Sequence, residues 1–168
     1  MKDQYSFELM LWQLIHGTLR TVDKLWDQEL QKRGLSSRKA AVIRAALRLG
    51  QRATVTEISR QLFIEINTTS EQLKRMEHDG LIRKVKCLGT KNALRVEVTA
   101  KGHELYLKTE TVESIQITMS VLTDKEKTEL WSILSKIRQK AVSELALQNM
   151  DLYPPADYES IDSFDGAT

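Results

Sequence analysis

The segment from Thr54 to Gly80, TVTEISRQLFIEINTTSEQLKRMEHDG, carries the pattern that decides the fold. Thr54, followed three residues later by Glu57, is a capping box and predicts a short helix over residues 56–62. A second helix is predicted from about Asn67 to His78, with Gly80 ending it. The side chains spaced to lock two helices across a tight turn are Thr56, Ile58, Ser59, Leu62, Ile64, Thr69, Leu73 and Met76. This spacing predicts a helix-turn-helix.

The second of these helices is expected to turn a polar face outward. The residues on that face are Asn67, Thr68, Ser70, Glu71, Lys74 and Arg75. Short hydrogen-bonding side chains in a first turn suit the base edges of a DNA major groove, and cations one turn later suit the flanking phosphates. The alternative interpretation is an ordinary solvated face on a three-helix unit.

The neighbouring segments add a wing and two preceding helices. Residues 81–87 and 94–99 are strand-like, and turn residues from Gly89 to Asn92 join them into a hairpin with a basic tip. Upstream, a helical period runs from Ser6 to Lys32, and Ser36 is placed to cap a helix over 37–49. The apolar stripe of the first helix is unusually wide, so we expect that helix to meet two surfaces.

Two further helices are predicted after the hairpin. The first runs from Ala100 to about Val121 with Thr99 as its cap, and the second from Asp124 to about Gln148 after a Thr123–Glu126 capping box. The predicted fold is therefore mainly α with a small β-hairpin wing, a winged helix-turn-helix with long N- and C-terminal dimerisation helices. Trp26 and Trp131 are expected to be core or dimer-interface anchors.

The composition points to an ordinary globular protein of the cytoplasm. Hydrophobic residues make up 41% of the 168 positions and charged residues 29%, and no apolar run approaches the roughly 20 residues of a membrane span. The N-terminus lacks the features of a secretory signal. Cys87 is the single cysteine and cannot form an internal disulfide. It is expected to be a small apolar filler on the first wing strand, with a redox sensor as the alternative.

The net charge of +2 conceals an acidic tail. Residues 149–168 hold five Asp and Glu and no Lys or Arg, which leaves the remainder of the chain at +7. A basic body is compatible with a polyanionic partner. The tail has two interpretations: a solvating segment, or an internal competitor that folds over the basic face.

Other chemistry is weakly indicated. Trp12 and His16, four residues apart on the first helix, form a candidate pocket for an aromatic or acidic effector, with helix packing or a surface histidine as the alternative. His78, His103 and Glu104 do not form a convincing metal set, so no metal is expected. No nucleophile elbow, P-loop or dinucleotide loop is present, and we expect neither a cofactor nor enzymatic activity.

The stretch from residue 34 to residue 102 resembles the core of the MarR family of bacterial transcription factors. The resemblance rests on TVTEISRQL, LKRMEHDGLIRK and VEVTAKG in this order and spacing, and with the flanking helices it covers about residues 5–148. It implies a triangular homodimer, held by the first helix and the last two. A recognition helix would lie in each of two major grooves of a pseudo-palindromic operator, with a wing at the minor groove, and repression is often relieved by a small ligand.

This resemblance divides the chain and assigns its DNA-binding residues. The winged-helix domain is 1–148, with a DNA-binding core at about 34–102, dimerisation helices at about 5–33 and 100–148, and the acidic tail at 149–168. The DNA-binding residues expected are Arg38, Asn67, Thr68, Ser70, Lys74, Arg75, Lys91 and Arg95. The predicted function is that of a sequence-specific transcriptional regulator, a repressor acting as a homodimer. The alternative is a winged-helix module that binds proteins and no specific DNA.

Two segments depart from the family pattern. Thr90, Lys91 and Asn92 stand at the wing where the family usually has an Asp-Arg-Arg-like segment, and Lys91 lacks the flat guanidinium suited to a narrow groove. At the turn before the recognition helix, Phe63 and Glu65 replace the usual small and capping residues.

Overall fold

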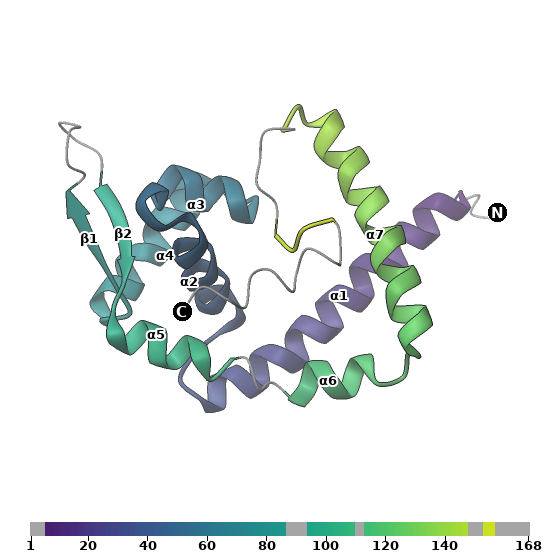
Figure 1. The fold of residues 1–168 in the computed structure, drawn as a ribbon, viewed down its shortest axis with the longest axis horizontal. Coiled ribbons are helices and arrows are strands. Elements are labelled where there is room, and N and C mark those ends of the chain that lie inside the picture. The colour runs from purple at the N-terminus through teal and green to yellow at the C-terminus, as the bar shows by residue number, and fades with distance from the viewer. Residues whose placement is uncertain (1–5, 87–93, 110–112, 148–152, 157–168) are drawn as a thin grey trace, which may run out of the picture.

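The computed structural model describes residues 6–86, 94–109, 113–147 and 153–156 (Figure 1). The helices are α1 (Phe7–Lys32), α2 (Ser37–Leu49), α3 (Val55–Leu62), α4 (Ile66–His78), α5 (Ala100–Leu107), α6 (Glu113–Met119) and α7 (Asp124–Glu144). A 3-10 turn, Gly50–Arg52, follows α2. The strands β1 (Ile82–Lys86) and β2 (Leu94–Val98) pair antiparallel with Ile82 opposite Val98. The predicted fold class is confirmed, and the predicted element order holds except after the hairpin, where two helices stand in place of one.

The elements form two groups. Helices α2, α3 and α4 pack together with the β1–β2 hairpin and α5 on one side, while α1, α6 and α7 extend away from them (Figure 1). The C-terminal end of α1 joins the groups, because Leu30 and Leu35 are buried in the same core as α2. Within the described residues, no helix has both the length and the apolar content that a membrane span requires.

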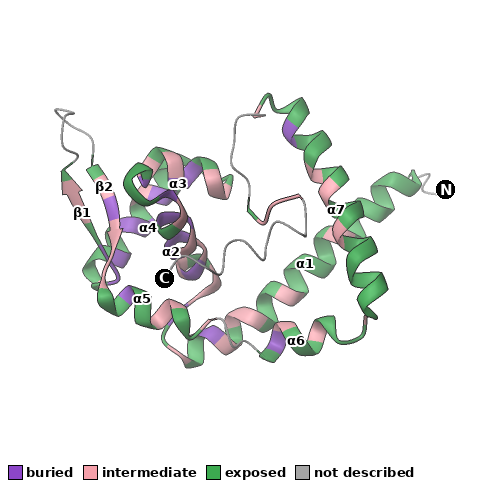
Figure 2. Ribbon diagram, in the orientation of Figure 1, coloured by how far each residue is buried: buried purple, intermediate pink, exposed green. Residues whose placement is uncertain are grey.

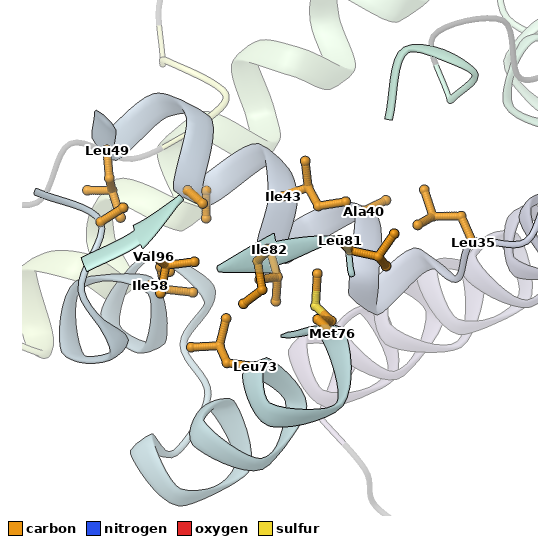
Figure 3. Close-up of a cluster of buried hydrophobic side chains, with 14 of the residues drawn as sticks. Leu35, Ala40, Ile43, Leu49, Ile58, Leu73, Met76, Leu81, Ile82 and Val96 are labelled. Atoms are coloured by element: carbon orange, nitrogen blue, oxygen red, sulfur yellow. The ribbon is translucent and has the colours of Figure 1, made fainter. Parts of the chain in front are cut away.

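The hydrophobic core lies inside the winged unit. Ile43 of α2, Ile58 of α3 and Leu73 of α4 have no exposed surface, and Ile82 and Val96 close the cluster from the hairpin (Figure 3). Each fully buried aliphatic side chain stabilises the folded state by about 1.5–3 kcal/mol relative to exposure. The helix-turn-helix is therefore held as a rigid body.

The helix caps follow local sequence signals. The side chains of Ser36, Thr54 and Thr99 each accept a backbone N–H in the first turn of the helix that follows. The predicted caps at Ser36 and Thr99 are confirmed, whereas the predicted Thr54–Glu57 capping box is only half formed, because the N–H of Thr54 donates to the carbonyl of Arg52 at 2.7 Å. Thr123 and Glu126 form the reciprocal capping box. Each such cap contributes about 1 kcal/mol to stability.

The single helix predicted from Ala100 to Val121 is wrong. Helix α5 ends at Leu107, Lys108 and Thr109 form a turn, and α6 begins at Glu113. The cause lies on α1, where the Glu29 carboxylate accepts the backbone N–H groups of Glu113 at 3.2 Å and Ser114 at 2.9 Å. Arg33 pairs with Glu29 at 3.0 Å and donates to the carbonyl of Lys108, so both sides of the break are bound to α1.

The last helix ends at Glu144, earlier than the predicted Gln148. Ala146 adopts a left-handed conformation with φ 53°, and the N–H of Leu147 turns back to the carbonyl of Val142 at 3.0 Å. This is the hydrogen-bond pattern that ends many helices, here with alanine where glycine is usual.

Exposure differs between the two groups. Helices α1, α6 and α7 are mostly exposed, whereas the winged unit holds most of the buried residues (Figure 2). The large apolar side chains exposed on these three helices include Phe7, Met10, Trp12, Leu14, Leu19, Leu25, Ile117, Leu130, Ile133, Leu134 and Ile137. The chain alone thus leaves a large apolar surface open to water, which isolated globular proteins rarely do.

A short segment after α7 returns to the winged unit. The Tyr153 ring lies under the guanidinium groups of Arg44 and Arg48, at 5.3 Å and 4.5 Å from the ring centre. The carbonyl of Ala156 accepts the indole N–H of Trp131 at 2.9 Å and the hydroxyl of Ser135 at 3.3 Å. Residues 153–156 therefore connect α2 with α7 (Figure 1). Most of the acidic tail lies outside the described residues.

Candidate nucleic-acid interface

The turn between α3 and α4 is fixed by hydrogen bonds from the end of α3. The carbonyl of Ser59 accepts the N–H of Ile64 at 3.1 Å, and the buried Ser59 hydroxyl donates back to the carbonyl of Ile64. Phe63 takes a left-handed conformation with φ 54°, which lets the chain reverse within three residues. Helix α4 is consequently held at one angle to α3.

Helix α4 has two distinct faces. Its buried face, comprising Thr69, Gln72, Leu73 and Met76, packs into the core. The predicted outward residues Asn67, Thr68, Glu71, Lys74 and Arg75 are all exposed, and Ser70 is half-buried at the edge. Neither Lys74 nor Arg75 has an ion-pair partner within the described ranges of the chain. Donors, acceptors and two unpaired cations therefore share one exposed helix face.

The C-terminal end of α4 is anchored to α2 and α5. Lys39 pairs with Asp79 at 2.8 Å, and the Lys101 ammonium donates to the carbonyl of Asp79 at 2.8 Å. The hydrogen bond from Lys39 holds the pKa of the Asp79 carboxyl below its usual value. Sequence reasoning missed these anchors, because each pair joins residues 22 or 40 positions apart.

The wing is tied to α4 and braced internally. Glu77 of α4 accepts the backbone N–H of Lys84 at 2.9 Å and its ammonium at 3.2 Å. On the hairpin, Glu97 pairs with Arg83 at 2.6 Å and also with Arg95. The pKa of the Glu97 carboxyl is lowered, first by its hydrogen bond from Arg83 and then by that from Arg95. Recognition helix and wing thus form one rigid unit.

Arg38 and Arg95, two other predicted DNA-binding residues, lie on α2 and β2 rather than on α4. Arg95 is half-buried against Glu97, with its guanidinium engaged in an ion pair. Arg38 lies in the first turn of α2 and lines a hollow of about 550 Å³ together with Arg20, Asp23, Lys24, Asp27, Ser36 and Ser37. Lys91 and the neighbouring wing tip lie outside the described residues, as does Cys87.

The two candidate effector residues are in contact with each other. The rings of Trp12 and His16 stack with centres 5.2 Å apart and an interplanar angle of 11°. Both side chains are exposed on α1. No group of three or more metal-ligating side chains gathers at one point in the described part of the chain.

Charge is divided unevenly along the sequence. Residues 34–102, which include α2, α3, α4, both strands and the start of α5, contain 14 Lys and Arg against 6 Asp and Glu, a net charge of +8. The rest of the chain contains 11 Lys and Arg against 17 Asp and Glu, a net charge of −6. The positive field that attracts a polyanion therefore belongs to the unit that carries α4.

A transcriptional regulator is similar to this chain in sequence. No protein-family model matches the chain. The HTH-type transcriptional regulator PecS of Dickeya dadantii is 26% identical over 138 residues, spanning 77% of this chain and 83% of that protein.

Solved structures give the same answer. The organohalide-sensing transcriptional regulator RdhR, with 2,4-dichlorophenol bound, aligns with a TM-score of 0.80 and 26% identity, covering 91% of this chain and 92% of that one. A mutant MarR from E. coli complexed with operator DNA aligns with a TM-score of 0.73 and 19% identity over 81% of this chain and 99% of that one, a likeness of fold.

Proposed function

We propose that this chain is a MarR-type transcriptional regulator that binds double-stranded DNA at specific sequences. Its structural neighbours are regulators of that family, as the resemblance of residues 34–102 implied. The observation that carries the proposal is the exposed polar and cationic face of α4, presented by a locked turn on a unit of charge +8.

Within this function, we assign base contacts and phosphate contacts to different residues along α4. Asn67 and Thr68, with Ser70 at the edge, lie in the first turn, which in helix-turn-helix proteins contacts base edges. Lys74 and Arg75 follow one to two turns later, where phosphates flank the groove. Base contacts distinguish sequences because each base pair presents its own pattern, whereas phosphates are identical at every step.

The test starts from a random duplex library selected with the wild-type protein. The expected result is enrichment of one pseudo-palindromic sequence whose affinity falls steeply with salt, by a log–log slope of about −0.9 per neutralised phosphate. Equal binding to selected and random duplexes would instead favour the alternative, a winged-helix module that binds proteins.

Alanine variants then distinguish residues that contact bases from residues that contact phosphates. Asn67→Ala or Thr68→Ala should change the selected sequence, at about 1–3 kcal/mol per lost base contact. Lys74→Ala should weaken all sequences alike and make the salt slope shallower by about one unit. The matched controls are Gln116→Ala and Lys136→Ala, which remove exposed polar and cationic side chains from α6 and α7. If the Asn67 and Thr68 variants select the wild-type sequence, α4 is not the reading helix.

We further propose that the protein acts as a homodimer, through α1, α6 and α7. The support is the apolar surface that these helices leave exposed. A symmetric dimer carries two copies of α4, which suits a two-fold operator. As a repressor of bacterial genes it would act in the cytoplasm, without enzymatic activity. Residues 34–102 would be its DNA-binding core and the flanking helices its dimerisation unit.

A small-molecule effector is the remaining part of the proposal. RdhR is described as organohalide-sensing and binds 2,4-dichlorophenol, and the stacked Trp12 and His16 offer an aromatic platform on α1. Because both rings are exposed in one chain, a second copy would have to enclose the site. Titration with 2,4-dichlorophenol should change Trp12 fluorescence, and Trp12→Phe should abolish the change while Trp131→Phe retains it. An unchanged response in Trp12→Phe would place the effector elsewhere.

A further inference from the structure

Two apolar side chains stand exposed at the corner where α3 meets α4. Phe63 is 55% exposed and Ile66, the first residue of α4, is 51% exposed. Apolar side chains of this size are usually buried, and isolated exposures need no explanation. Here two occur three residues apart, beside the face proposed to read DNA.

The backbone at this corner makes the exposure of Phe63 more notable. With φ 54°, Phe63 occupies the left-handed region, where glycine or asparagine fits without strain and a bulky side chain does not. The bonds between Ser59 and Ile64 hold the turn in this shape. The ring and the Ile66 side chain are therefore presented from a fixed backbone.

The charges around Phe63 and Ile66 indicate which part of a bound DNA would face these two side chains. Glu65 lies between the two apolar residues, is exposed, and makes no side-chain capping bond to α4. Its carboxylate would repel a phosphate placed against this corner. The unit as a whole nevertheless carries a charge of +8 and presents Lys74 and Arg75 farther along α4. A polyanion docked on α4 would thus turn its base edges toward the corner and its phosphates toward the cations.

The major groove contains one apolar group that such a corner can contact, the 5-methyl group of thymine. Cytosine lacks this methyl group and presents instead an amino group, which can donate a hydrogen bond to a carboxylate such as that of Glu65. We propose that Phe63 and Ile66 read thymine methyl groups at the edge of the operator half-site, and so add apolar specificity to the polar contacts of α4. This inference rests on the proposed function.

The effect of one methyl group can be isolated chemically. Deoxyuridine pairs as thymidine does and lacks only the 5-methyl group, so its substitution changes no hydrogen bond. Burial of one methyl group corresponds to a factor of about four in affinity. For each thymine of the selected operator, the ratio of thymine affinity to uracil affinity therefore measures the contact directly.

The experiment compares these ratios for the wild type, Phe63→Gly, Ile66→Ala and the control Val121→Ala, which shortens an exposed apolar side chain between α6 and α7. Glycine removes the ring of Phe63 and keeps the left-handed turn. Wild type and Val121→Ala should lose about fourfold at one or two thymines of each half-site. The Phe63 and Ile66 variants should bring that ratio close to one, a change that a general loss of folding would not produce.

The outcomes separate this inference from the function on which it rests. If the wild type selects no sequence, the proposed function fails and the inference with it. If the wild type selects a sequence but no uracil substitution weakens binding, or if the ratios persist in both variants, only the thymine contact is overturned. Loss of the ratio in either variant but not in Val121→Ala supports it.

Discussion

At the scale of single residues, Gly102 shows how closely α5 approaches the hairpin. A Cβ at this position would overlap the carbonyl oxygen of Leu81 and lie 3.0 Å from Cγ1 of Val98. A backbone carbonyl cannot move aside as a flexible side chain can, so only glycine fits. Gly102→Ala should lower the free energy of unfolding by about 1–3 kcal/mol, as overpacking does. Urea denaturation should show a lower midpoint with an unchanged slope.

Gly17 is the matched control for this substitution. It lies in the middle of α1, is exposed, and would have open space around a Cβ. Gly17→Ala should raise the free energy of unfolding by about 0.5–1 kcal/mol, because alanine restricts the unfolded chain and favours the helix. Both variants must be compared at one protein concentration, since dimerisation adds to stability. Equal effects of the two substitutions would contradict the close approach of α5.

At the scale of elements, Glu29 decides where α6 begins. Its two carboxylate oxygens accept the first N–H groups of α6, where a negative charge also favours the helix dipole. Hydrogen bonding from Ser114 is the main cause that lowers the pKa of Glu29 from its ordinary 4.5. Because folding lowers this pKa, the carboxylate stabilises the folded state above about pH 4.5 and contributes less as the pH falls through the folded pKa.

Glu29→Gln tests this capping role. The neutral amide has one acceptor oxygen, so the variant should have a Tm lower by a few degrees at pH 7. The difference from the wild type should shrink as the pH falls from 4.5 through the lowered pKa of the folded state, where the Glu29 carboxylate of the folded wild type becomes protonated. Glu129→Gln, an exposed carboxylate on α7, is the control and should leave the Tm nearly unchanged. A difference that is constant from pH 7 to pH 3 would exclude the charge as the cause.

The starts of the helices show what a sequence can and cannot predict. Ser36, Thr54, Thr99 and Thr123 act on N–H groups three residues away, so a local pattern was sufficient to place the starts of four helices. Glu29 acts on residues 84 and 85 positions later, and no local pattern reveals such a partner. The single helix predicted from Ala100 to about Val121 was wrong for this reason, since α5 ends at Leu107 and Lys108 and Thr109 form a turn.

The recognition face was predictable on the same grounds. Asn67, Thr68, Lys74 and Arg75 were placed outward by helical periodicity, and the structure exposes them. Arg95 was predicted with them as a DNA-binding residue, yet Glu97 lies on the same side of β2, and the structure pairs the two. Periodicity gives the face on which a residue lies, whereas its partner depends on what else shares that face.

At the scale of the whole molecule, the exposed apolar surface of α1 and α7 predicts that one chain does not exist alone. Leu14 on α1 is 66% exposed. Leu14→Glu should weaken the dimer at least about a hundredfold, because a two-fold interface loses the apolar contact twice and places both charges in it. Sedimentation at micromolar concentration should report a dimer for the wild type and a shift toward monomer for the variant.

Gln13→Glu is the control for that experiment. It adds the same charge at the neighbouring exposed position of α1 and removes no apolar side chain. It should sediment as the wild type does. A wild type that sediments as a monomer at all concentrations would remove the proposed dimer, and with it the expectation of a two-fold operator.

Residues 153–156 make the molecule comparable to a braced frame. The winged unit and the long helices are joined near the C-terminal end of α1. A single junction of this kind would allow the two groups to bend relative to each other. Residues 153–156 contact Trp131 of α7 and also Arg44 and Arg48 of α2. This third connection adds stiffness against bending. In a dimer, that stiffness would set how far the two copies of α4 can spread, and thus which half-site spacings are tolerated.

The Tyr153→Ala variant should bind operators lengthened or shortened by one base pair with a smaller loss of affinity than the wild type. The Tyr153→Phe variant, which keeps the ring, should lose as much affinity on these operators as the wild type does. Identical spacing profiles for all three proteins would mean that the angle between the winged unit and the long helices is fixed without the contacts of Tyr153.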